Sequence, residues 1–123
     1  MNSALRVDVA DTHDETVALA LAGELGLGTA TVLYSSVQGA LADHTTVILD
    51  LTKVTFCDSS GLNTLLRLRR HAQGTDRRLI LVAPPTQMMR LLTITGTGAI
   101  FTIYSSLAEA RRNHSAPGGS ATP

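Results

Sequence analysis

The segment Asp58-Ser59-Ser60-Gly61 places a carboxylate, two hydroxyls and a glycine directly before a run with helical periodicity. Apolar residues recur at three- and four-residue steps over 62–72, which predicts an amphipathic helix. Asp58 is placed to cap this helix, because its carboxylate can accept hydrogen bonds from the free amides of the first turn. Ser59 is then predicted to be the first helical residue, with its hydroxyl near the surface.

A hydroxyl at this position is suited to phosphorylation. A phosphate adds about −1.5 to −2 charges, and a helix N-terminus stabilises a nearby anion by roughly 0.3–1 kcal/mol. We therefore expect a phosphate on Ser59 to leave the fold intact and to act on whatever docks there. The same residues also suit a helix cap with no further role, and the local chemistry leaves both interpretations open.

The sequence does not fit two catalytic uses of these serines. A nucleophile elbow requires glycine two residues before and after its serine, and around Ser59 these positions hold Cys57 and Gly61. A phosphate-binding P-loop requires a Gly-Lys-Ser/Thr ending, which the sequence lacks. A single cysteine excludes an intrachain disulfide, and the four dispersed histidines lack ligand spacing. We expect no enzymatic activity, no metal and no cofactor.

Strands and helices alternate along the chain, and this order predicts how the serine segment is positioned. The predicted strands cover residues 4–9, 16–22 (ended by Gly23), 46–51, 78–83 and 100–103. The predicted helices cover residues 29–41 (capped by Thr29), 59–74, 86–95 (ended by Gly96) and 105–113.

This order predicts a single α/β domain over residues 1–113, with a mixed, mostly parallel sheet of four to five strands and about four helices. No helix separates the first two strands, so the first is expected to be antiparallel and near an edge. The strand order stays open. Residues 114–123, HSAPGGSATP, predict a disordered C-terminal tail.

Charge and hydropathy limit the partners. The net charge of zero over 123 residues argues against a general affinity for nucleic acid or an anionic membrane. Residues 1–58 carry eight acids and two bases, and residues 59–123 carry two acids and eight arginines. This asymmetry in charge is typical of a polarised docking surface. If the two halves of the sequence are intermixed in one sheet, the opposite charges instead leave no coherent patch. With no signal-like or membrane-spanning apolar run, the expected location is the cytoplasm.

Three landmarks carry a family resemblance: Ala22-Gly23-Glu24-Leu25, then Phe56-Cys57-Asp58-Ser59-Ser60-Gly61-Leu62, then Arg90-Leu91-Leu92-Thr93-Ile94-Thr95-Gly96. In this order and spacing they resemble the STAS domain of bacterial anti-sigma-factor antagonists, over residues from about 4 to 112. The resemblance implies phosphorylation of Ser59, with Asp58, Ser60 and Gly61 supporting the switch.

The resemblance also implies partners. The kinase is itself the anti-sigma factor, and a metal-dependent serine phosphatase reverses the modification. The unphosphorylated antagonist binds the anti-sigma factor, so that the sigma factor is released and transcription is regulated. The implied docking surface consists of Gly26, Leu27, Gly28, Thr29, Ser59 and Leu62. Leu62 also fits a core position, and the glycines also fit loop geometry alone.

Two positions depart from the family pattern: Gly26 stands where many members have an aspartate, and Thr93 replaces an acid common in the third helix. Two other functions stay open. One is a structural STAS subunit of a transporter or a stress-sensing complex. The other is direct binding of a small ligand or nucleotide at the serine edge, although the sequence lacks a glycine-rich phosphate loop.

Overall fold

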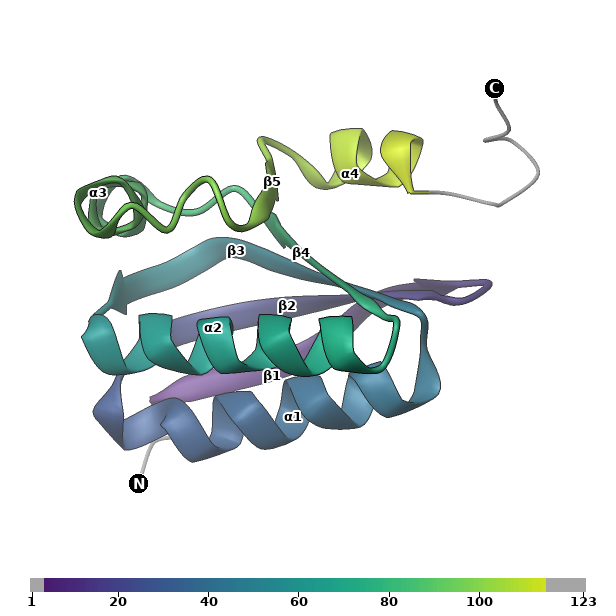
Figure 1. Cartoon of the computed structure of the whole chain (residues 1–123), viewed down its shortest axis with the longest axis horizontal. Coiled ribbons are helices and arrows are strands. Elements are labelled where there is room, and N and C mark those ends of the chain that lie inside the picture. Colours follow the sequence, from purple (N-terminus) through teal and green to yellow (C-terminus); the bar gives the residue numbers. More distant parts are fainter. Residues whose placement is uncertain (1–3, 115–123) are drawn as a thin grey trace.

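The alternating strands and helices build one five-stranded sheet in the order β1-β2-β3-β4-β5 (Figure 1). The computed structural model describes residues 4–114. Its strands are β1 (Leu5–His13), β2 (Thr16–Leu25), β3 (Thr46–Cys57), β4 (Arg78–Val82) and β5 (Thr102–Tyr104). Its helices are the 3-10 turn η1 (Leu27–Thr29), α1 (Ala30–Asp43), α2 (Ser59–Gly74), α3 (Thr86–Thr95) and α4 (Leu107–Asn113).

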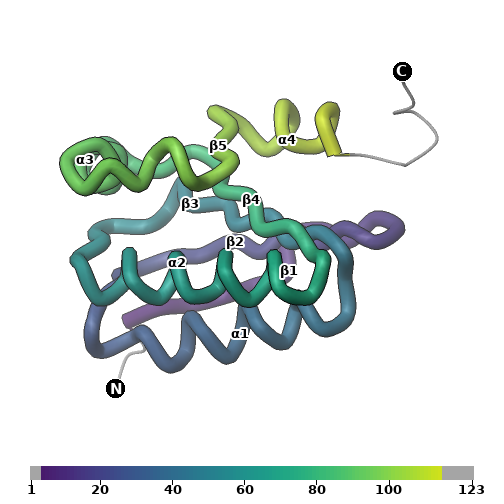
Figure 2. The backbone as a smooth tube through the Cα atoms, in the orientation of Figure 1, coloured from purple at the N-terminus to yellow at the C-terminus, as the bar shows by residue number. Residues whose placement is uncertain are grey.

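The sheet is mixed and mostly parallel, as predicted. β1 pairs antiparallel with β2 and forms one edge, while β2, β3, β4 and β5 pair in parallel. Each parallel pair is joined through a helix, because parallel neighbours require a crossover connection. The tip of the β1–β2 hairpin, the purple turn in Figure 2, projects beyond the rest of the sheet.

Several strand boundaries differ from the prediction. Gly23 does not end the second strand: β2 continues to Leu25. Gly23 has φ +122, and a Cβ on it would lie 2.0 Å from the Ala4 carbonyl oxygen. Glycine at this position therefore allows β2 to approach the backbone at Ala4 closely. β3 continues to Cys57, and β5 begins at Thr102. Hydrogen bonding between neighbouring strands sets these ends, and the pattern of apolar residues does not indicate where that pairing stops.

The core lies on both faces of the sheet. One cluster of buried residues joins β1–β4 to α1, α2 and α3, including Leu33, Leu65 and Met88. A smaller cluster on other residues of β2–β4 packs against Ala110 of α4. Residues 47–49 are all buried, consistent with a central strand covered on both faces.

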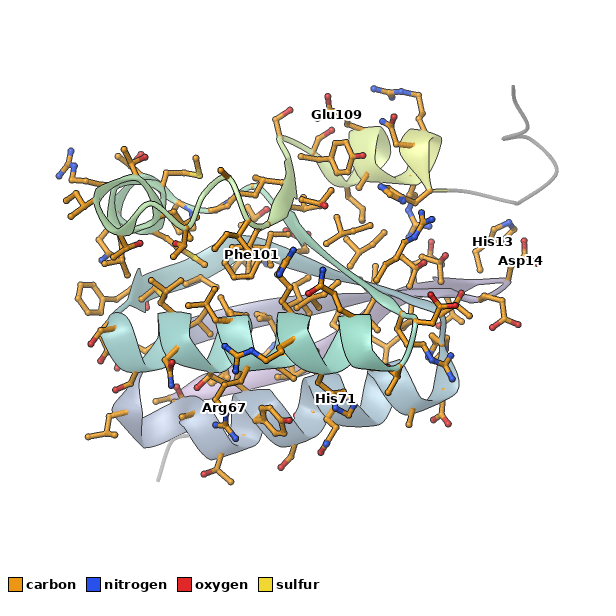
Figure 3. The ribbon with its side chains drawn as sticks, viewed as in Figure 1. His13, Asp14, Arg67, His71, Phe101 and Glu109 are labelled. Atoms are coloured by element: carbon orange, nitrogen blue, oxygen red, sulfur yellow. The ribbon has the colours of Figure 1, made fainter. Side chains whose placement is uncertain are left out.

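The helices α1 and α2 lie side by side across one face (Figure 1). The guanidinium carbon of Arg67 on α2 lies 4.6 Å from the ring centroid of Tyr34 on α1, and this contact links the two helices (Figure 3).

Within residues 4–114, no helix is both long and apolar enough to cross a bilayer. Except for His114, the tail predicted at 114–123 lies outside the described residues.

Candidate functional site

The first turn of α2 has the geometry predicted for the Asp-Ser-Ser-Gly segment. Asp58 is the N-cap residue, with extended backbone. Its Oδ1 accepts hydrogen bonds from the backbone N–H of Ser60 at 2.8 Å and of Gly61 at 3.0 Å. Ser59 is the first helical residue and is exposed, whereas Ser60 is half-buried. The cap therefore satisfies two first-turn amides and leaves Ser59 at the surface.

The end of β2 holds this turn in place from one side. The Asp58 backbone N–H donates to the Leu25 carbonyl at 3.0 Å. A Cβ on Gly61 would lie 2.0 Å from the same carbonyl oxygen, which is far inside van der Waals contact. Glycine at position 61 therefore lets α2 begin directly against the end of β2.

Gln87, in the first turn of α3, holds the same segment from the other side. Its Oε1 accepts from the Cys57 backbone N–H at 2.9 Å, and its Nε2 donates to the Cys57 carbonyl at 2.8 Å. β4 pairs with β3 only over residues 46–50, so the far end of β3 lacks this strand neighbour. The Gln87 amide takes the place of a peptide from a neighbouring strand.

Gln87 was not among the residues predicted from the sequence, because no signal in the sequence distinguishes it. A glutamine in a first helical turn is ordinary. Its role depends on β4 ending well before β3 does and on α3 starting beside the end of β3 that has no β4 neighbour, both of which are tertiary features.

The predicted loop 26–29 lies against the capping aspartate. The Thr29 hydroxyl donates to the Glu24 carbonyl at 2.8 Å and accepts from the Gly26 N–H at 3.0 Å. A Cβ on Gly26 would lie 2.8 Å from Asp58 Oδ2. Thr29 occupies the N-cap position of α1 as predicted, but its side chain makes no hydrogen bond to that helix and closes the loop instead.

The apolar side chains around Ser59 divide into exposed and buried ones. Leu27 in η1 is 79% exposed, and Phe56 at the end of β3 is 47% exposed. Leu62, predicted to anchor a partner, is only 5% exposed and belongs to the core. Its place on the inner stripe of α2 explains this burial. Leu27 and Phe56 are the exposed large apolar side chains on η1 and on the end of β3, the elements that adjoin the first turn of α2.

Cys57 lies just before the cap and is fully buried. Burial raises the pKa of its thiol to about 12, and the neighbouring Asp58 charge acts in the same direction. The thiol is therefore neutral near pH 7 and unsuited to nucleophilic chemistry.

Thr93, the position in the third helix that departs from the family pattern, is exposed, and its hydroxyl donates a hydrogen bond to the Met89 carbonyl at 3.0 Å.

The sequence also matches a family model, described as "Mlab, STAS domain", over residues 9–103. The chain belongs to the STAS domain family. The landmarks of this STAS domain that were far apart in sequence, at 22–25 and 56–62, meet at the start of α2.

Solved structures show the same fold. An anti-sigma factor antagonist from Mycobacterium paratuberculosis matches this STAS domain with a TM-score of 0.76 at 27% identity, over 88% of this chain and 92% of the other. SpoIIAA from Bacillus, in its phosphorylated form, matches with a TM-score of 0.65 at 24% identity, over 90% and 100%. A sulfate transporter family protein from Wolinella succinogenes matches with a TM-score of 0.70 at 14% identity, over 81% and 85%. The last two similarities establish the fold alone.

Proposed function

We propose that this STAS domain is an anti-sigma factor antagonist that phosphorylation of Ser59 switches off. The observation that carries the proposal is the exposed Ser59 hydroxyl at the first position of α2, directly after the capping Asp58. The similarity to the mycobacterial anti-sigma factor antagonist over most of both chains supports it. In this proposal the unphosphorylated chain binds an anti-sigma factor with serine kinase activity, and the sigma factor is released.

A phosphate on Ser59 would act on the partner more than on the fold. Asp58 already uses the backbone N–H groups of Ser60 and Gly61, so those amides are not free to hold a second anion. The phosphate would therefore project into solvent beside a carboxylate, adding about two negative charges to one small area. A partner that fits the neutral surface would meet both bulk and charge repulsion.

The docking surface we propose consists of Ser59, Leu27, Phe56 and the backbone of the loop 26–29. Two exposed apolar side chains beside a switch residue suit a protein interface, since large apolar side chains commonly anchor such contacts. The hydrogen bonds of the Thr29 hydroxyl with Gly26 and Glu24 close the loop that carries Leu27. We propose that the chain acts as a binding module in the cytoplasm, with no catalysis of its own and no binding to nucleic acid or membrane.

The test combines phosphosite mapping with binding. Incubated with its anti-sigma kinase and ATP, the wild-type chain should gain one phosphate, detected by mass spectrometry. Ser59→Ala should gain none, and Ser60→Ala, the matched control, should still be modified. Ser59→Asp should bind the kinase more weakly in calorimetry, and a metal-dependent serine phosphatase should remove the phosphate. A phosphate found only on Ser60 would contradict the proposal.

A second candidate function is a structural STAS subunit of a transport assembly. The similarity in fold to a sulfate transporter family protein favours it. In that case the serines serve as caps and contacts. Co-purification of the chain with a transporter component, with Ser59 unmodified and Ser59→Asp without effect on binding, would favour this function over the first.

A further inference from the structure

A second candidate site lies at the opposite end of α2 from Ser59. A cavity of about 260 Å³, here called the basic pocket, opens between the last turns of α2, the start of β4, the segment before β5 and the end of α4. α2 has 16 residues, so its two ends are about 24 Å apart. The basic pocket is therefore separate from the switch edge, as the run of α2 in Figure 1 shows.

Three arginines line this pocket: Arg69, Arg77 and Arg78. Within residues 4–114, the basic partners in ion pairs are Arg6, His13 and Arg111. The three arginines of the pocket therefore have no carboxylate partner in that part of the chain. No acidic residue from that part of the chain lines the pocket. The basic excess of the second half of the sequence is thus partly concentrated in one hollow, and its charge is not neutralised by protein acids.

His114 adds a hydrogen-bonding group without adding charge. Its Nδ1 lies 3.4 Å from Arg78 Nη1, and its Nε2 lies 2.9 Å from the Tyr104 hydroxyl. Because a guanidinium can only donate, this contact requires an unprotonated Nδ1. Burial lowers the pKa of His114, and the Arg78 charge lowers it further. The imidazole is therefore neutral and helps to orient Arg78.

The wall of the pocket is apolar. Leu79 and Ile80 line it and are almost fully buried, while Ile100 is 42% exposed at its edge. A bare inorganic anion would leave Ile100 in contact with water. A ligand that carries a small apolar group on its anionic head would cover the isoleucine and meet the arginines together.

We propose that the basic pocket binds a small phosphate monoester with an apolar body. A phosphate dianion matches the forked donors of several arginines, which bind phosphate oxygens in pairs. The volume admits a phosphate with one ring. This inference is independent of the function proposed for Ser59.

The test uses phenyl phosphate as the probe and the full chain in a ¹H–¹⁵N NMR titration. Amide signals of Leu79, Ile80 and Thr102 should shift in a saturable way. Arg77→Gln should weaken binding about tenfold, as expected for the loss of one charge-assisted contact. Arg70→Gln, the matched control on the exposed face of α2, should bind as the wild type does, and so should Ser59→Ala.

Two further probes separate the contributions of charge and apolar surface. Phenol, which lacks the phosphate, should not bind, and inorganic phosphate should bind more weakly than phenyl phosphate. Thermal unfolding of Arg77→Gln establishes that this variant is folded. The proposal is overturned if these amides do not shift, if phenol or inorganic phosphate binds as well as phenyl phosphate, or if Arg70→Gln loses as much affinity as Arg77→Gln.

Discussion

Replacing Gln87 with alanine tests how the segment before the switch serine is held. The variant removes both hydrogen bonds between the Gln87 amide and the Cys57 peptide, at 2.9 and 2.8 Å. It leaves the other bond that fixes this segment, from the Asp58 N–H to the Leu25 carbonyl, in place. The substitution therefore isolates the contribution of α3 to the start of α2.

The expected loss follows from the two backbone groups left without a partner. Leaving a buried donor or acceptor unsatisfied costs about 1–3 kcal/mol for each group. Gln87 is only half-buried, so water can reach the vacated space and the lower end of this range applies. The two groups together predict a loss of about 2 kcal/mol in the free energy of unfolding. With a urea m-value of about 1.5 kcal/mol/M, the midpoint falls by roughly 1.3 M.

Urea unfolding followed by circular dichroism measures this change, and Gln73→Ala is the matched control. Gln73 is exposed and is bonded through its side chain to Arg69, so its loss should change stability by less than about 0.5 kcal/mol. In NMR spectra, Gln87→Ala should also shift the amide signals of Asp58 and Ser59. If the midpoints of the Gln87 and Gln73 variants agree, the amide of Gln87 does not hold the end of β3 and the reasoning is refuted.

The remaining predictions concern the backbone around the cap and the buried thiol. Gly61→Ala should destabilise the chain by about 3 kcal/mol in urea unfolding, because its Cβ would meet a carbonyl oxygen at 2.0 Å; Gly74→Ala, which meets open space, should change stability by less than about 1 kcal/mol. Gly26→Ala should cost about 1 kcal/mol by displacing the capping carboxylate, and equal midpoints for Gly26→Ala and Gly28→Ala would contradict this. Cys57 should react with iodoacetamide at pH 8 only as the chain opens. Since folding raises the pKa of this thiol from 9.0 to about 12, the free energy of unfolding should fall as pH rises through this interval; rapid labelling of the native chain would refute its burial.

The fold class, the order of the elements and the helix cap could be predicted from the sequence. Each depends on local patterns: alternating or apolar runs for strands, three- and four-residue steps for α1 and α2, and an Asp before a helical run for the cap at Asp58. The exposure of Ser59 follows from the same pattern, because a first helical residue on the polar side faces solvent. These features depend on interactions between residues that are close together in the sequence.

The tertiary structure alone decided which distant groups meet. It placed Gly26 against Asp58 and brought Gln87 to the end of β3 that β4 does not reach, because strand lengths and pairing registers fix these approaches. It also buried Leu62, whose position on α2 fitted both a core and a surface role. The hollow lined by Arg77 and other arginines exists because the ends of two helices converge there, and no pattern of local residues encodes that convergence.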